Sequence, residues 1–530
     1  MIETRQPLYT DSEWTPEHIE KVTEAIKEIA DNELELSYYP MQIRIITSEQ
    51  MLDAYASNGM PVGYFHWSFG KHFLQNAKSY KQGHMGLAYE IVINTDPCLV
   101  FCMEDNTMTM QALVIAHAGF GHNAFFKNNY MFKQWTHPDG ILDYLEFARN
   151  YIHDCEEKYG TEAVSLIIDA CHALRFYGVD RYKHPPVISA KAEQERMQAR
   201  ITEIERNLNV LWASPTIASS SSEEKPFPSE LQENILYFIE KHAPSLPPWK
   251  REIIRIVRKI AQYFYPQMST KVMNEGFACF THYYITTRLY EKGLITDGAY
   301  QEFLHMHTNV INQPDYDATA NIVIGIDSEG KPIIQKKSIY GGINVYALGF
   351  AMFMDIKRIC EHPTDEDRKW FPYLAGTPWL PAIKSAMENF KDESFILQYL
   401  SPELIRRFKF FAFRDDELEE EYEITAIQDD EGYQYVREVL ARQYDQGLFL
   451  PDIQVEHVDV RGDRMLTLRH AMRDQKVLEA EDTERMVEYL HLLWEYPVLL
   501  KTVDPEDDTI VEAWQMISDE VEFLDQFEKK

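Results

Sequence analysis

The chain has 530 residues, of which 45% are hydrophobic and 13% aromatic, a composition typical of a globular protein with several domains. Its 85 acidic residues outnumber its 52 basic residues and give a net charge of −33 at pH 7. This charge repels the phosphates of nucleic acids and anionic lipids, and the sequence has no apolar run of 18 residues, so we expect neither nucleic-acid binding nor a membrane span.

The N-terminal part, residues 1–213, is expected to mix helices with a short strand. Residues 87–94 are rich in Val and Ile and predict that strand. Either Asn106 or Thr107 can cap the helix that follows, because both side chains accept hydrogen bonds from free backbone N–H groups. This helix carries two histidines.

The two histidines, His117 and His122, lie five residues apart. On a regular helix they would point about 140° away from each other and could not bind one ion. A π-bulge adds one residue to a turn and would bring both onto one face, and Gly119 and Gly121 between them allow it. The alternative is one buried, hydrogen-bonded histidine and one surface histidine.

The rest of the chain divides into four segments by composition and periodicity. A Ser- and Pro-rich stretch at 214–230 predicts a linker, and a helical part with an inserted β-hairpin at 321–335 follows over 231–415. The order βαββαβ over 416–510 predicts a ferredoxin-like domain, and 511–530 is an acidic tail. The expected fold is mainly α with a small β-sheet and a zincin-like core, plus this α+β C-terminal domain.

A helix expected over 270–292 carries Glu275. When two histidines come from one helix, a carboxylate from a separate helix is the usual third ligand, so we predict a metal site of His117, His122 and Glu275. Zinc suits these nitrogen and oxygen ligands, although iron or manganese would fit them as well. The alternative is a glutamate near a helix start, stabilised by the helix dipole.

Other polar side chains can support such a site. Three amides after the second histidine could hold the peptide groups of a substrate or could end the helix: Asn123, Asn128 and Asn129. His282 lies two turns from Glu275 on the same helix face, roughly 10 Å away, and could line the cleft without binding the ion. Asp169 and His172 share a helix face and, with Asn274, could orient the ligands; a purely structural pair is the alternative.

Several segments resemble the bacterial SpoVR family, named for stage V sporulation protein R. The matching segments are Tyr64-Phe-His-Trp-Ser-Phe-Gly-Lys71, Gly86-Leu-Ala-Tyr-Glu-Ile-Val-Ile-Asn94, Glu104-Asp-Asn-Thr-Met-Thr-Met-Gln111, Ala116-His-Ala-Gly-Phe-Gly-His-Asn123, Phe125-Phe-Lys-Asn-Asn129, Asp169-Ala-Cys-His-Ala-Leu174, Lys271-Val-Met-Asn-Glu-Gly276, Tyr346-Ala-Leu-Gly-Phe-Ala-Met352, Pro451-Asp-Ile-Gln-Val455 and Gly462-Asp-Arg464. The resemblance implies a role in the peptidoglycan cortex of spores, or a stress-linked module with a serine protein kinase and a von Willebrand A-type protein. It supplies no catalytic residues.

Three functions are compatible with these observations. The first is a cytoplasmic regulatory protein of the cell-envelope or stress pathway, because the N-terminus lacks a signal peptide and the six dispersed cysteines predict no disulfide framework. The second is a divergent zincin-like metallohydrolase acting on a peptide or a peptidoglycan stem peptide. Ala118 stands where the usual base would be, so Glu90, Glu104 or Glu156 would have to serve. The third is a metal-dependent oxidoreductase.

Overall fold

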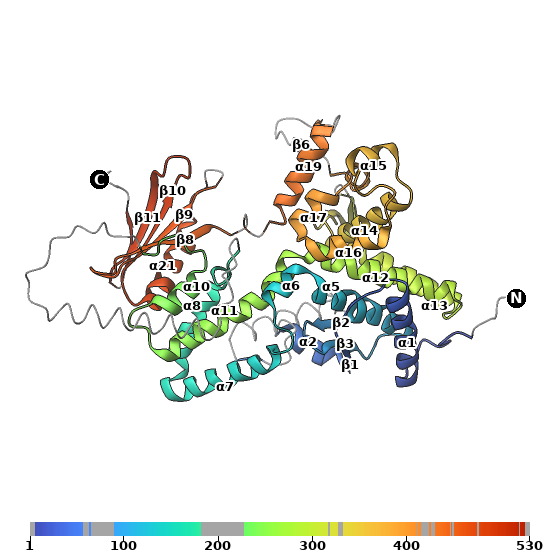
Figure 1. The fold of residues 1–530 in the computed structure, drawn as a ribbon, viewed down its shortest axis with the longest axis horizontal. Coiled ribbons are helices and arrows are strands. Elements are labelled where there is room, and N and C mark those ends of the chain that lie inside the picture. The colour runs from blue at the N-terminus through green and yellow to red at the C-terminus, as the bar shows by residue number, and fades with distance from the viewer. Residues whose placement is uncertain are drawn as a thin grey trace, which may run out of the picture. The chain divides into compact units, whose positions relative to one another are not determined.

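The structure is a computed structural model that describes most of the chain. The described residues are 6–56, 63–64, 90–181, 227–315, 318–326, 332–410, 412–414, 423–425, 430–445, 447, 450–473, 476–518 and 520–524. They are mainly helical, with small sheets, and form two compact units (Figure 1). The first unit joins residues 1–164 and 262–449, and the second joins residues 165–261 and 450–530.

A three-stranded sheet lies in the first unit. Its order is β1 (Met41–Ile46), β3 (Cys98–Met103), β2 (Glu90–Ile93), with β1 parallel and β2 antiparallel to β3. All six residues of β3 are buried, as expected of a central strand. The strand predicted over 87–94 is therefore confirmed from Glu90, and residues 87–89 lie outside the described part of the chain.

The helices that follow this sheet build the centre of the first unit. α4 (Met108–Val114) continues into the π-helix η1 (Ile115–His122) and α5 (Asn123–Asn128). Thr107, and not Asn106, caps α4, because its hydroxyl accepts a hydrogen bond of 3.2 Å from Met110 N. η1 and α14 (Val345–Glu361) both pack extensively against α12 (Lys271–Glu291).

Shorter helices and two strand pairs complete the first unit. The helices are α1 (Pro16–Asn32), α2 (Ser48–Ala56), α6 (Tyr130–Trp135), α7 (Ile141–Tyr159), α13 (Asp297–Val310), α15 (Asp365–Trp370), α16 (Trp379–Asn389), α17 (Asp392–Tyr399), α18 (Pro402–Arg407) and α19 (Asp430–Arg442). β4 (Thr319–Ile326) and β5 (Pro332–Ser338) pair antiparallel, which confirms the hairpin predicted at 321–335. β6 (Ala412–Arg414) and β7 (Glu423–Thr425) form the other pair.

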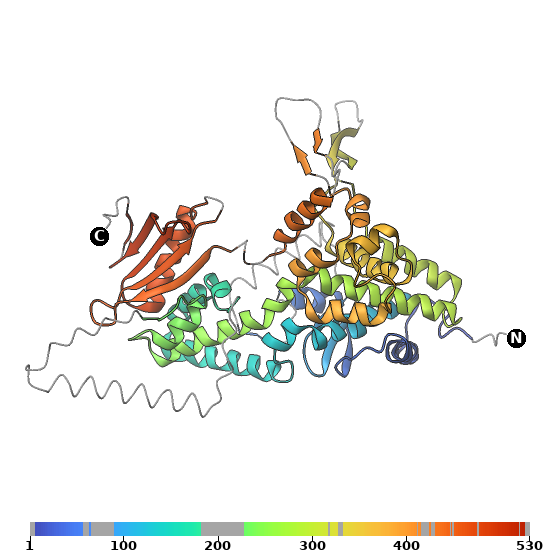
Figure 2. The ribbon, with the colours of Figure 1, turned by 45° about the horizontal axis from the view of Figure 1, so that its top comes forward.

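The second unit contains a five-stranded sheet whose order is β12 (Val521–Leu524), β11 (Ile510–Met516), β10 (Val498–Val503), β9 (Leu466–Ala471), β8 (Asp452–Val458). The strands form one layer (Figure 2), and α21 (Ala480–Trp494) packs on it with Trp494 fully buried. α10 (Ile235–His242) and the short η2 (Arg175–Tyr177) also belong to this unit, and α8 (Thr161–Ala173) and α11 (Pro248–Ser269) each cross the division between the units.

The predicted ferredoxin-like domain is wrong in two respects. Its first strand and helix, β7 and α19, belong to the first unit, and the sheet instead takes β11 and β12 from the stretch predicted as an acidic tail. That stretch was predicted as a tail because of its acids, but β11 packs against α21 and buries Ala513 and Met516.

The compact units also differ from the predicted sequential parts 1–213, 231–415 and 416–510, because each unit assembles two distant stretches. The predicted linker 214–230 lies outside the described residues up to position 226. The six cysteines are buried and free. Among the described helices, none has both the length and the apolar character needed to cross a bilayer.

Candidate metal centre

The π-helix predicted from the histidine spacing is confirmed over Ile115–His122. It places His117 and His122 side by side, with ring centroids 4.6 Å apart at an angle of 87°. Gly121 allows η1 to touch α12, because a Cβ at this position would lie only 2.6 Å from Ala278 Cα. The wider turn and the backbone contact together direct both rings towards α12.

On its other side, α12 packs against α14 through a pair of glycines, one from each helix. A Cβ on Gly276 would lie 2.3 Å from the carbonyl carbon of Gly349, so α12 and α14 cross in backbone contact. The N-terminus of α12 is fixed by Asp392, whose carboxylate accepts hydrogen bonds of 2.9 Å from Val272 N and Met273 N. Glu275 therefore projects from a helix that is held at its start and on two sides.

Four side chains meet in this region. His117 Nε2 lies 3.2 Å from Glu90 Oε1 and 3.7 Å from Glu275 Oε2, and His122 Nε2 lies 3.4 Å from Glu275 Oε2. Two ligands of a tetrahedral zinc ion, each bound at about 2.0–2.1 Å, are separated by about 3.3–3.4 Å. The observed separations bracket that value, so the donor atoms fit one small divalent cation.

The charges of the cluster also fit a cation. Burial lowers the pKa of His122, but Glu275 and Glu90 outweigh burial and raise this pKa to about 9. Burial opposes ionisation of Glu275, whose pKa is nevertheless below its usual range because of the two histidines. Burial raises the pKa of Glu90, and its buried Oε2 has no hydrogen-bond partner among the described residues. An unpaired buried carboxylate oxygen is costly unless a cation or proton meets it.

The outer ring nitrogens are held by hydrogen bonds. His122 Nδ1 lies 2.8 Å from Asn274 Oδ1; since the amide oxygen accepts, this nitrogen donates, and Nε2 is the nitrogen that faces the carboxylates. Asn274 thus holds the ring as the sequence predicted. His117 Nδ1 lies 2.8 Å from His282 Nδ1, and His282 Nε2 lies 2.8 Å from His307 Nδ1.

His282 was predicted to line a cleft, and this prediction is corrected. The His282 ring is buried and hydrogen bonded to His117. The contact of η1 with α12 brings His117 close to His282, although His282 lies two turns beyond Glu275 on α12. Burial lowers the pKa of His282, and it lowers that of His307 to about 4, so both rings stay neutral. A neutral chain can pass a donated hydrogen bond from His117 to His282 and on to His307.

The three asparagines make hydrogen bonds within the fold. The Asn123 amide exchanges two hydrogen bonds of 2.8 Å with the backbone of Tyr39, and Asn128 donates to Ser37 O and Ala124 O. Asn129 caps α6 and donates to two backbone carbonyls of the α16 region. The alternative reading, in which such amides end helices and tie loops, is the one that the structure supports.

The remaining candidates lie elsewhere. Glu104 is an exposed residue after β3, and Glu156 projects from α7; within the described residues, neither has a recorded contact with the cluster. Asp169 and His172 belong to the second unit, whereas the cluster belongs to the first. Of the three proposed bases, only Glu90 reaches the histidines, because β2 begins beside η1.

Sequence reasoning missed three residues at this site: Tyr346, Cys279 and His307. Tyr346 on α14 lies near Glu275, and it precedes Gly349 by one helical turn, so the glycine crossing brings it there. Cys279 and His282 follow Glu275 at spacings of four and seven, which place all three on one face. The ligand atoms of His117, Cys279 and His282 lie within 4.8 Å of one another. His307 carried no signal in the sequence.

Comparison with known proteins agrees with the motifs. A family model described as "SpoVR like protein" matches residues 13–449, and one described as "SpoVR-like C-terminal domain" matches residues 451–505. The boundary between the two family models coincides with the boundary between the two units at residues 449 and 450. The chain is 50% identical over 478 residues, 90% of each chain, to the "Uncharacterized protein YcgB" of Escherichia coli (strain K12). No solved structure matches the chain.

Proposed function

The chain belongs to the SpoVR family, and we propose that it is a metal-dependent hydrolase that cleaves a peptide bond at the cluster of His117, His122, Glu275 and Glu90. The observation that carries this proposal is the position of Glu90. Its carboxylate faces a pair of imidazoles, carries an unpartnered buried oxygen and has a raised pKa, which are properties of a general base beside a bound ion.

The three ligands would be His117 Nε2, His122 Nε2 and one oxygen of Glu275. A bound zinc ion would polarise the substrate carbonyl and lower the pKa of a water molecule. Glu90 would accept the proton of the attacking water and return it to the leaving amine, the role that Ala118 cannot fill. Side-chain exposures of 18% for Glu90 and 17% for Glu275, against 5–6% for the histidines, place the accessible side at the carboxylates.

The biological setting comes from the family. We propose a cytoplasmic protein that acts on a peptide or a peptidoglycan stem peptide, linked to spore-cortex formation or to the stress response. A serine protein kinase and a von Willebrand A-type protein are the proposed partners, by family resemblance alone. A peptide substrate follows from the chemistry of the donor set, which resembles that of zinc peptidases.

A second function is a regulatory protein with a structural metal ion. The observation that favours it is the separation of 3.2 Å between Glu90 Oε1 and His117 Nε2, which is close to that of two ligands on one ion. Glu90 would then be the fourth ligand and would close the coordination shell, leaving no position for water. The two functions differ in what Glu90 does.

Glu90→Gln separates them, because the amide cannot act as a base and binds zinc poorly. Zinc content by elemental analysis and cleavage of a peptide library by mass spectrometry are measured together. For the hydrolase, the variant keeps about one zinc per chain and loses at least about 100-fold in turnover. For the structural site, the variant loses zinc and the wild-type protein cleaves nothing. Zinc retained by both His117→Ala and Glu275→Ala contradicts both functions.

A further inference from the structure

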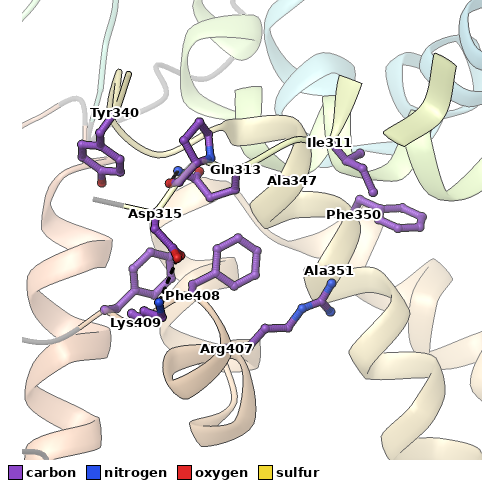
Figure 3. A pocket seen from close by; sticks show the side chains of 12 residues that line it. Ile311, Gln313, Asp315, Tyr340, Ala347, Phe350, Ala351, Arg407, Phe408 and Lys409 are labelled. Atoms are coloured by element: carbon purple, nitrogen blue, oxygen red, sulfur yellow. Dashed lines mark hydrogen bonds and ion pairs between the residues drawn. The ribbon is translucent and has the colours of Figure 1, made fainter. Parts of the chain in front are cut away.

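A separate cavity of about 450 Å³ lies in the first unit, between the end of α13, one side of α14 and the residues that follow α18 (Figure 3). It is lined by Ile311, Gln313, Pro314, Asp315, Tyr340, Ala347, Phe350, Ala351, Arg407, Phe408, Lys409 and Phe410. None of the residues of the candidate metal centre lines it. Its volume is in the range of cavities that hold small molecules.

Part of the cavity wall is apolar and aromatic. Ala347, Phe350 and Ala351 come from one side of α14, and Phe408 and Phe410 stack on each other, with ring centroids 5.2 Å apart. Small alanines beside large rings leave a slot that an apolar, flat group can fill. This part of the wall favours a ligand with an apolar body.

The polar groups at the rim are mostly occupied by one another. Lys409 Nζ pairs with Asp315 Oδ2 at 2.9 Å. The Gln313 amide accepts from Asn344 N at 2.6 Å and donates to Pro314 O at 3.0 Å. These groups shape the opening but leave little free hydrogen-bonding capacity for a ligand.

Arg407 differs from its neighbours. Figure 3 shows its side chain extending towards α14, and its guanidinium lies over the Phe408 ring, 5.9 Å from the ring centroid; within the described residues it makes no hydrogen bond or ion pair. The adjacent Arg406 binds both oxygens of Glu366, at 3.0 and 2.7 Å. The Arg407 side chain is exposed, and no carboxylate of the described residues neutralises it. It presents a fork of donors that matches a carboxylate, phosphate or sulfonate.

We propose that this cavity is a binding site for a small amphiphilic anion. The apolar, preferably aromatic, body of the ligand lies against Phe350, Phe408 and the alanines of α14, and its single anionic group binds Arg407. The cavity lies beside the histidine chain that supports the metal centre, because the ring centroids of Phe350 and His307 are 4.8 Å apart. The proposal does not depend on the bound metal or on hydrolysis.

The test uses two fluorescent probes of nearly the same shape with the full-length protein: 8-anilinonaphthalene-1-sulfonate, which is anionic, and N-phenyl-1-naphthylamine, which is neutral. We expect one saturable site for the anionic probe, weakened by salt and about tenfold weaker in Arg407→Gln, a loss equivalent to about 1.4 kcal/mol. The neutral probe should bind both proteins equally, since it has no group for Arg407.

Two further variants complete the test. Arg406→Gln removes the neighbouring, already paired arginine and should leave the binding of both probes unchanged. Ala351→Phe fills the slot and should abolish binding of both, with circular dichroism to verify that the variant is folded. Equal binding of the anionic probe by wild type and Arg407→Gln would overturn the proposal, as would unchanged binding by a folded Ala351→Phe, which would place the probe elsewhere on the surface.

Discussion

Two buried carboxylate sites, one in each unit, differ in what neutralises them. In the second unit, Glu240 is 2% exposed and pairs with Arg255 at 2.9 Å, Arg258 at 3.0 Å and Lys241 at 3.3 Å. Burial opposes its ionisation, but these permanent cations outweigh it and lower the pKa of Glu240. At the metal centre of the first unit, the ion-pair partners of Glu90 and Glu275 among the described residues are imidazoles. The site around Glu240 is thus neutralised by permanent cations of the protein, whereas the metal centre leaves a place that an added cation can fill.

The largest loss of stability is expected at Glu240, whose partners carry permanent positive charges. Glu240→Ala leaves Arg258 buried without its partner and should lower the free energy of unfolding of the second unit by about 3–5 kcal/mol. The loss should be the same with zinc or with a chelator, as measured by denaturant unfolding. Glu157→Ala, at an exposed ion pair with His153, is the control and should change stability by less than about 0.5 kcal/mol. A zinc-dependent loss in Glu240→Ala would erase the contrast between the units.

Zinc should stabilise the first unit and leave the second unchanged. At a free zinc concentration about 1,000 times Kd, binding to the folded state adds about 4 kcal/mol to the free energy of unfolding. Glu275→Gln should remove this gain and should also lower the stability of the metal-free protein, because it takes away the carboxylate that pairs with His122. Denaturant unfolding followed with and without zinc measures both quantities. An undiminished zinc effect in the variant would remove Glu275 from the site.

Acid should weaken the second unit without any role for metal. Burial lowers the pKa of His470 to about 4, and its ring is hydrogen bonded to Thr502 Oγ1 at 3.1 Å. Because the unfolded chain takes up this proton near pH 6.5, the free energy of unfolding should fall by about 3 kcal/mol between pH 6.5 and pH 4. His470→Asn should flatten this part of the pH profile of unfolding in the presence of a chelator. A profile as steep as the wild-type one would show that other groups cause the loss.

The smallest effect concerns the support of the metal centre. His282→Phe removes the acceptor for His117 Nδ1 and should weaken zinc binding about 10- to 100-fold without abolishing it. Competition with a zinc chelator measures the affinity, and His305→Phe, at an exposed residue of α13, is the matched control. Zinc binding that is unchanged in His282→Phe would show that the histidine chain does not orient His117.

The sequence predicted the parts of this account that depend on local spacing. Histidines five apart with two glycines between them indicated the π-helix, and Glu275 followed from the need for a carboxylate on a second helix. It could not predict which candidate base reaches the histidines, because the contact of Glu90 with His117 depends on where β2 starts relative to η1. His307 and Tyr346 were missed because only the backbone contacts of α12 with its neighbours bring them to the site. β11 and β12 were missed because the acidic composition of this stretch favoured a tail and neither strand has a regular alternation of buried residues.

The most direct test of the central claim is the metal content of protein purified without added metal, together with His117→Ala, Glu275→Ala and the exposed-histidine control His153→Ala. We predict about one zinc ion, or another divalent ion, per chain in the wild type and the control, and none in the other two variants. A wild-type chain that carries no metal and binds none on titration would contradict the account, and so would metal retained by both His117→Ala and Glu275→Ala.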